Sequence, residues 1–79
     1  PQGVLETTRD INVYPNPASM VLNVQAPVGA VTSLYNAFGQ LVVVGTTEKR
    51  IDLTALSNGV YEVVIEYNGI IINKKIIKS

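Results

Sequence analysis

The 79-residue chain contains no cysteine, no histidine and no tryptophan, and only 15% of its residues are charged. Without cysteine, the fold has no disulfide bond and the chain offers no thiolate as nucleophile or metal ligand. Without histidine, it lacks the commonest general base and the commonest side-chain ligand of transition metals. The sequence therefore predicts a protein that is not an enzyme and needs no cofactor or metal.

An excess of charge of one sign is also missing, because six basic and six acidic residues cancel. Nucleic-acid-binding domains and membrane-surface helices usually carry a basic excess, so neither class is favoured. No apolar run in the sequence reaches the roughly 20 residues that span a bilayer. The sequence shows neither an initiator methionine nor a signal-peptide pattern. We expect it to be a piece of a longer polypeptide.

What the chain has is a high apolar content, 47% of its residues, arranged with a period of two. In residues 20–24, every second position is apolar, with Met20, Leu22 and Val24. Residues 61–67 repeat this pattern with Tyr, Val, Ile and Tyr at every second position. This alternation is typical of strands with one inward and one outward face. Turn signals divide the chain into seven expected strands, at residues 10–14, 20–26, 30–36, 40–46, 48–53, 60–67 and 70–78. Short strands at this spacing predict an all-β fold, a seven-stranded Ig-like antiparallel β-sandwich.

Each break between strands has its own physical cause. The Pro-Asn-Pro segment at residues 15–17 removes two backbone donors and ends the first strand. Residues 36–39 predict a loop whose glycine takes the left-handed position after a type I turn. Residues 53–58 predict a single helical turn, closed by positive φ at Asn58 and Gly59.

The strongest hairpin signal is Asn-Gly at residues 68–69, which predicts a two-residue type I′ turn with φ > 0 at both positions. Counting outward from this turn places Ile65 opposite Ile72. It also places Glu62 opposite Lys75, an outward pair of opposite charge.

The same register places Lys74 opposite Val63, on the inner face of the hairpin. Either the last strand carries a bulge near Asn73, or Lys74 extends its ammonium group to the rim of the sandwich. We favour the bulge, because it would also turn Ile77 inward.

A search for chemistry in the remaining motifs finds weak candidates. Glu62 and Glu66 lie on one face of the same strand and could be read as a hydrolytic pair, but a solvated sheet face is the better interpretation. The four tyrosines could form a sugar-binding platform, although without tryptophan they fit core or rim positions better. The six glycines are scattered, so no phosphate-binding loop is formed.

The two ends of the chain differ in character. Residues 1–10 are mostly polar and lack strand alternation, which predicts a linker, with a short edge strand through Val4 and Leu5 as the alternative. Residues 74–78 hold Lys74, Lys75 and Lys78, half of the six basic residues. Lysines protect a soluble edge strand from unwanted pairing, but a terminal basic strand can also be read by a partner through strand addition.

Four motifs occur in a specific order: Val-Tyr-Pro-Asn-Pro at residues 13–17, Leu-Tyr-Asn-Ala-Phe-Gly-Gln-Leu-Val at 34–42, Leu-Ser-Asn-Gly-Val-Tyr at 56–61, and Lys-Lys-Ile-Ile-Lys-Ser at 74–79. Together they closely resemble the type A C-terminal sorting domain of the type IX (Por) secretion system of Bacteroidetes. The resemblance covers about residues 10–79. The family often has proline before Gly-Val-Tyr, where this chain has Ser57 and Asn58.

The resemblance implies a folded signal, an Ig-type sandwich that directs its cargo protein from the periplasm across the outer membrane to the cell surface or beyond. Its expected partners are the outer-membrane translocon and a sortase-like component, which would remove the domain at a site in or before residues 1–10. The cargo would then be attached to anionic lipopolysaccharide or released.

By the same resemblance, the signal positions are Gly59, Tyr61, Lys74, Lys75, Ile76, Ile77 and Lys78. The Tyr-Pro-Asn-Pro motif at residues 14–17 and Gly39 also match, and we expect them to serve the fold. Two other functions stay open at this point: an accessory carbohydrate- or protein-binding module of a secreted protein, and a structural spacer. Exposed edge strands also make an edge-paired homodimer an expectation for the isolated domain.

Overall fold

The computed structural model describes residues 11–79, so the expected linker, with its cleavage site, lies outside the described residues. Seven strands follow one another: β1 (Asn12–Tyr14), β2 (Val21–Gln25), β3 (Val31–Tyr35), β4 (Leu41–Thr46), β5 (Arg50–Asp52), β6 (Gly59–Tyr67) and β7 (Ile70–Lys78). They confirm the predicted all-β, seven-stranded fold. No helix in the described part of the chain is long and apolar enough to cross a membrane.

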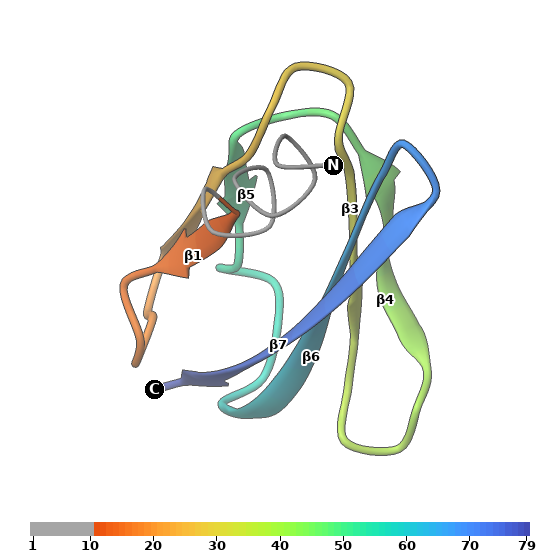
Figure 1. The fold of residues 1–79 in the computed structure, drawn as a ribbon. Coiled ribbons are helices and arrows are strands. Elements are labelled where there is room, and N and C mark those ends of the chain that lie inside the picture. The colour runs from red at the N-terminus through yellow and green to blue at the C-terminus, as the bar shows by residue number, and fades with distance from the viewer. Residues whose placement is uncertain (1–10) are drawn as a thin grey trace.

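The strands form two sheets, and every strand pair in them is antiparallel. One sheet has three strands in the order β1-β2-β5, and the other has four in the order β4-β3-β6-β7. In Figure 1, β1 and β5 lie on one side of the molecule and β3, β4, β6 and β7 lie on the other. This is the sandwich arrangement, and it leaves β7 at an edge of the larger sheet.

Alternate residues of both sheets point between them and form one core, as the period of two predicted. Its buried apolar members are Ile11, Val13, Ala18, Leu22, Val24, Ala30, Leu34, Ile51, Leu53, Tyr61, Val63, Ile65 and Ile76. Met20 does not join them and is 65% exposed, because β2 begins only at Val21. Among the described residues, no buried side-chain nitrogen or oxygen lacks a hydrogen-bond partner.

Two of the predicted glycine turns are confirmed. Asn68 and Gly69 have φ values of 54° and 78°, the positive pair that a type I′ turn requires. Gly39 has φ 81°, and its N–H donates to the carbonyl oxygen of Asn36 at 2.9 Å.

The segment before β6 differs from the expected helical turn. It makes one hydrogen bond of the turn type, from the N–H of Leu56 to the carbonyl oxygen of Leu53 at 2.9 Å. Gly59 has φ 154°, but Asn58 is not among the positive-φ residues, so the prediction for Asn58 is wrong. The physical reason is that Leu53 is fully buried and Asp52 fixes the next residues through its side chain, so the chain turns sharply without a helical turn.

The β6–β7 ladder is regular from its turn to its end. Glu62 pairs with Lys75 and Val63 with Lys74, as the plain register predicted, and the ladder shows no shift near Asn73. The favoured bulge is therefore wrong, and Ile77 does not turn inward. Lys74 is half-buried on the inner side of this edge strand, in agreement with the rim alternative.

The reason for the regular ladder is the residue that a bulge would displace. In plain register Ile76 lies opposite Tyr61 and is 0% exposed, whereas Ile77 is 48% exposed. Shifting the register by one residue would exchange these two side chains between core and solvent. Burying Ile76 therefore outweighs the cost of a lysine on the inner side.

Candidate functional site

The last strand, β7, is held on both sides along its C-terminal half. One side pairs with β6, and the other contacts residues 16–18, which we call the edge cap. The Oδ1 atom of Asn16 accepts a hydrogen bond from the N–H of Ile77 at 3.0 Å, and its Nδ2 donates to the carbonyl oxygen of Lys75 at 3.2 Å. The N–H of Ala18 donates to the carbonyl oxygen of Ile77, and the N–H of Ser79 donates to the carbonyl oxygen of Ala18, both at 2.8 Å.

The sequence of the edge cap explains its geometry. Pro15 and Pro17 have no N–H to donate, so the side-chain amide of Asn16 makes the contacts that a strand backbone would make. Ala18 is buried and pairs in parallel with Lys78. These contacts give the Pro-Asn-Pro motif the structural role that the sequence analysis expected.

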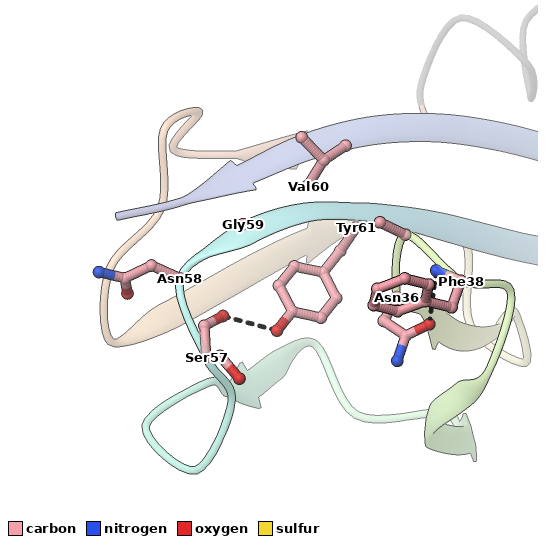
Figure 2. Close-up of a pocket in the computed structure, with 8 residues that line it drawn as sticks. Asn36, Phe38, Ser57, Asn58, Gly59, Val60 and Tyr61 are labelled. Atoms are coloured by element: carbon pink, nitrogen blue, oxygen red, sulfur yellow. Dashed lines mark hydrogen bonds between the residues drawn. The ribbon is translucent and has the colours of Figure 1, made fainter.

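A second feature lies at the end of the sandwich where β6 begins. A hollow of about 200 Å³ is lined by residues 36–38 of the β3–β4 loop and residues 57–61. A second hollow of about 330 Å³ adjoins it and shares Asn36, Ala37, Val60 and Tyr61 with it, adding Glu62 and Lys75. We call this region the end site; Figure 2 shows the first hollow.

Hydrogen bonds within the end site fix its walls. The hydroxyl of Tyr61 donates to the carbonyl oxygen of Ser57 at 2.6 Å, which closes the chain before β6. The Oδ1 atom of Asn36 accepts the N–H groups of Phe38 and Gln40 at 2.9 Å each. Figure 2 shows Tyr61 reaching Ser57, with Asn36 and Phe38 on the neighbouring loop. The site is therefore formed in advance rather than by a partner.

Phe38 is the residue that the sequence analysis missed. It is 88% exposed at the tip of the β3–β4 loop and lines the first hollow. The sequence identified its loop but gave it no function. The sequence does contain an indication of its exposure, because Phe38 is an aromatic residue within a predicted turn, where neither sheet can bury its side chain.

The structure brings some of the sequence-predicted signal positions together and separates others. Gly59 and Tyr61 line the first hollow, and Lys75 lines the second. Lys78 pairs with Gly59 across the ladder, and its Nζ donates to Oδ1 of Asn58 at 3.2 Å.

The other three predicted positions lie outside the end site. Ile76 belongs to the core, Lys74 is half-buried on the inner side of β7, and Ile77 is exposed on the outer side. A partner that docks on the folded domain can therefore contact Ile77 directly but cannot reach Ile76.

The acidic residues that the structure describes lie apart from one another. Within residues 11–79, no group of three or more histidine, cysteine or carboxylate side chains is placed to hold a metal ion. Glu62 and Glu66 are both exposed on the outer face of β6, as expected for a solvated sheet face. Asp52 is an exposed acid whose pKa lies below its ordinary value, because its carboxylate accepts hydrogen bonds from the backbone N–H and then the hydroxyl of Thr54.

The described residues form a small β-sandwich with a preformed end site and a capped last strand, an architecture typical of recognition modules. Residues 12–79 match the family model described as "Secretion system C-terminal sorting domain", of the Por type. The match spans all seven strands, and the chain belongs to this family. Comparison with curated proteins and comparison with solved structures each gave no significant match.

Membership in this family identifies the function of the domain. It is a sorting signal of the type IX secretion system, carried by a cargo protein, and it leads to secretion across the outer membrane. This role requires that the domain interact with the secretion machinery. The family is non-catalytic, which agrees with the prediction that the chain is not an enzyme.

Proposed function

We propose that the domain is a type A signal and that a component of the outer-membrane translocon reads it at the end site. The observation that carries this proposal is the convergence of Gly59, Tyr61 and Lys75 on two adjoining hollows. Preformed hollows with a few polar groups are typical of recognition sites. Phe38 beside them is the kind of aromatic side chain that dominates the affinity of protein interfaces.

The lysines of β7 give this contact its charge preference. Lys75 lines the second hollow and Lys78 lies beside Gly59 at the start of β6. Positive charge here accelerates association with an acidic receptor surface and suppresses association with basic ones. In this proposal the charged side chains select the partner, and Phe38 supplies apolar contact area.

The later steps are carried out by other proteins. The domain is in the periplasm when the translocon binds it, and it then crosses the outer membrane with its cargo. A sortase-like component removes the domain at a site in or before residues 1–10, after which the cargo is attached to lipopolysaccharide or released. The support for these steps is the family membership together with the polar sequence that precedes the match.

The test is a fusion of this chain to the C-terminus of a periplasmic reporter, expressed in a strain with a type IX system. We expect the reporter to reach the cell surface and to lose the domain, as measured by surface labelling and by mass spectrometry of the released reporter. Phe38→Ser should lower the surface-labelled fraction about tenfold, because an exposed aromatic anchor contributes about 1.4 kcal/mol or more to binding.

Val28→Ser is the matched control, because Val28 is also an exposed apolar loop residue, 92% exposed, and lies in the β2–β3 loop at the opposite end of the molecule (Figure 1). This variant should be exported like the parent. Equal export of the Phe38 variant would exclude the end site as the recognised surface. Retention of the parent fusion in the periplasm would contradict the export function of this chain itself.

Deleting residues 74–79 is a poor test of the same idea. The deletion would remove Ile76 from the core and the hydrogen bonds of Ile77 to the edge cap, so loss of export would also follow from loss of folding. Single substitutions of exposed residues separate recognition from stability.

A further inference from the structure

The backbone N–H and C=O groups of β7 point alternately toward β6 and away from it, and those that point away form the outer edge of the strand. Lys75 and Ile77 direct their outer groups toward the edge cap, as their hydrogen bonds to Asn16 and Ala18 show. Backbone groups of an edge strand point outward at every second residue. Ile71 and Asn73 therefore also direct their N–H and C=O groups away from β6.

The edge cap divides this edge into two parts. It covers the C-terminal part, from the carbonyl oxygen of Lys75 to the N–H of Ser79. Along residues 71–75, no strand of the described chain pairs with the outer side of β7. We call this part the open edge. Its exposed side chains on the outer face are Ile71, Asn73 and Lys75.

The charges of the open edge favour one kind of occupant. Lys74 lies on the inner side and Lys75 on the outer side of the same short segment. A second copy of the chain, paired edge to edge and antiparallel around Asn73, would bring four lysines into one seam, and like charges there oppose self-pairing. An extended segment with acidic side chains meets both lysines with opposite charge instead.

We propose that the open edge, residues 71–75, binds an extended acidic segment of a secretion-machinery protein by strand addition. This inference rests on the proposed sorting function and adds a backbone contact to the contact at the end site. The end site and the open edge are continuous, since Lys75 belongs to both. The edge cap sets where the added strand ends, because Asn16 already occupies the carbonyl oxygen of Lys75.

The test removes one outward N–H without removing a core contact. In the reporter fusion, Asn73→Pro deletes a donor that points away from β6, a position where edge strands tolerate proline. We expect the surface-labelled fraction to fall about tenfold, the effect of losing one backbone hydrogen bond and leaving its acceptor unpaired in a dry interface. Asn73→Ala removes the side chain and keeps the N–H, so it should be exported like the parent.

Val28→Pro controls for the proline itself. Val28 is the second residue of a turn in which the N–H of Ala30 donates to the carbonyl oxygen of Pro27 and Gly29 has φ 94°, so proline fits there. If the Asn73→Pro fusion and the parent fusion are exported equally, the strand-addition proposal is wrong. The sorting function is not affected by that result. A parent fusion that stays in the periplasm would instead contradict the sorting function.

A second measurement keeps the proposal testable if Asn73→Pro does not fold. The probe is a short acetylated peptide of alternating glutamate and valine, added to the isotope-labelled chain, with a lysine–valine peptide as control. We expect the glutamate peptide alone to shift the amide NMR signals of Ile71, Asn73 and Lys75 and to leave that of Ile77 unchanged. Shifts confined to the end site, equal shifts with both peptides, or a self-paired dimer in sedimentation at the same concentration would each overturn it.

Discussion

Ile76 and Ile77 are neighbours in the sequence and have opposite surroundings in the structure. Ile76 is fully buried between the sheets, and Ile77 lies on the outer side of β7. Both occur in the terminal motif that the resemblance gave a signalling role. The structure assigns Ile76 to the core, so its substitution should act on folding first.

We predict that Ile76→Ala lowers the free energy of unfolding by about 2–5 kcal/mol, the usual cost of truncating a buried isoleucine. Ile77→Ala should lower it by less than about 1 kcal/mol, because half of that side chain is already in water. Urea unfolding of the two variants measures the difference. Equal losses would contradict the register of the β6–β7 ladder.

Asp52 makes stability depend on pH in a defined direction. Its hydrogen bonds from Thr54 lower its pKa in the folded state, so its contribution is present above the unfolded-state pKa of about 3.9 and is lost as pH falls through the folded-state pKa. We predict that the difference in urea midpoint between the parent and Asp52→Asn is larger at pH 6 than at pH 2.5. A difference that is constant over this range would show that the carboxylate charge contributes nothing.

At the scale of elements, the β6–β7 hairpin is the longest pairing in the fold, and its turn depends on two residues with positive φ. Asn68 and Gly69 both have positive φ, which valine adopts only under strain. We predict that Gly69→Val lowers the free energy of unfolding by about 1–2 kcal/mol, measured as a lower urea midpoint. Asn68→Gly keeps the turn accessible and should change stability by less than about 1 kcal/mol. An unchanged midpoint in the valine variant would exclude the type I′ turn.

The elements were largely predictable, because local rules determine them. Alternation and turn residues located all seven strands to within a few residues, and counting from residues 68–69 gave the correct partners of Glu62 and Lys75. The bulge prediction failed because it weighed Lys74 and Ile77 and left out Ile76. The competing term, the burial of Ile76, depends on how the two sheets pack, and a strand pattern does not report that packing.

The candidate site was less predictable, because its parts come from distant segments. Gly59, Tyr61 and Lys75 came from resemblance, but their convergence with the loop of Phe38 depends on the β3–β6 pairing. The edge cap joins Asn16 to Lys75 and Ile77, which lie 59 and 61 positions later in the sequence. No local pattern encodes such a contact, and composition marked the Pro-Asn-Pro motif only as a strand end.

At the scale of the whole molecule, the edge cap connects the two sheets. It lies in the segment between β1 and β2 of the three-stranded sheet and bonds to β7 of the four-stranded sheet. We predict that Asn16→Ala lowers the free energy of unfolding by about 1 kcal/mol, since two hydrogen bonds at an exposed site are lost. The amide hydrogen of Ile77 should then exchange with solvent faster, as measured by hydrogen–deuterium exchange.

Ser19→Ala is a suitable control, because Ser19 is exposed and adjoins the edge cap without belonging to it. It should change neither the stability nor the exchange rate at Ile77. Unchanged protection of Ile77 in Asn16→Ala would show that the Asn16 side chain does not hold the strand.

The contribution of β7 to the core has a consequence for the order in which a cargo protein is made. Ile76 and the backbone groups that meet the edge cap all belong to β7, the last strand of the domain to be synthesised. A chain cut short by a stalled ribosome or a nonsense codon lacks them and cannot complete the sandwich. Only a polypeptide synthesised through β7 can therefore form the folded domain.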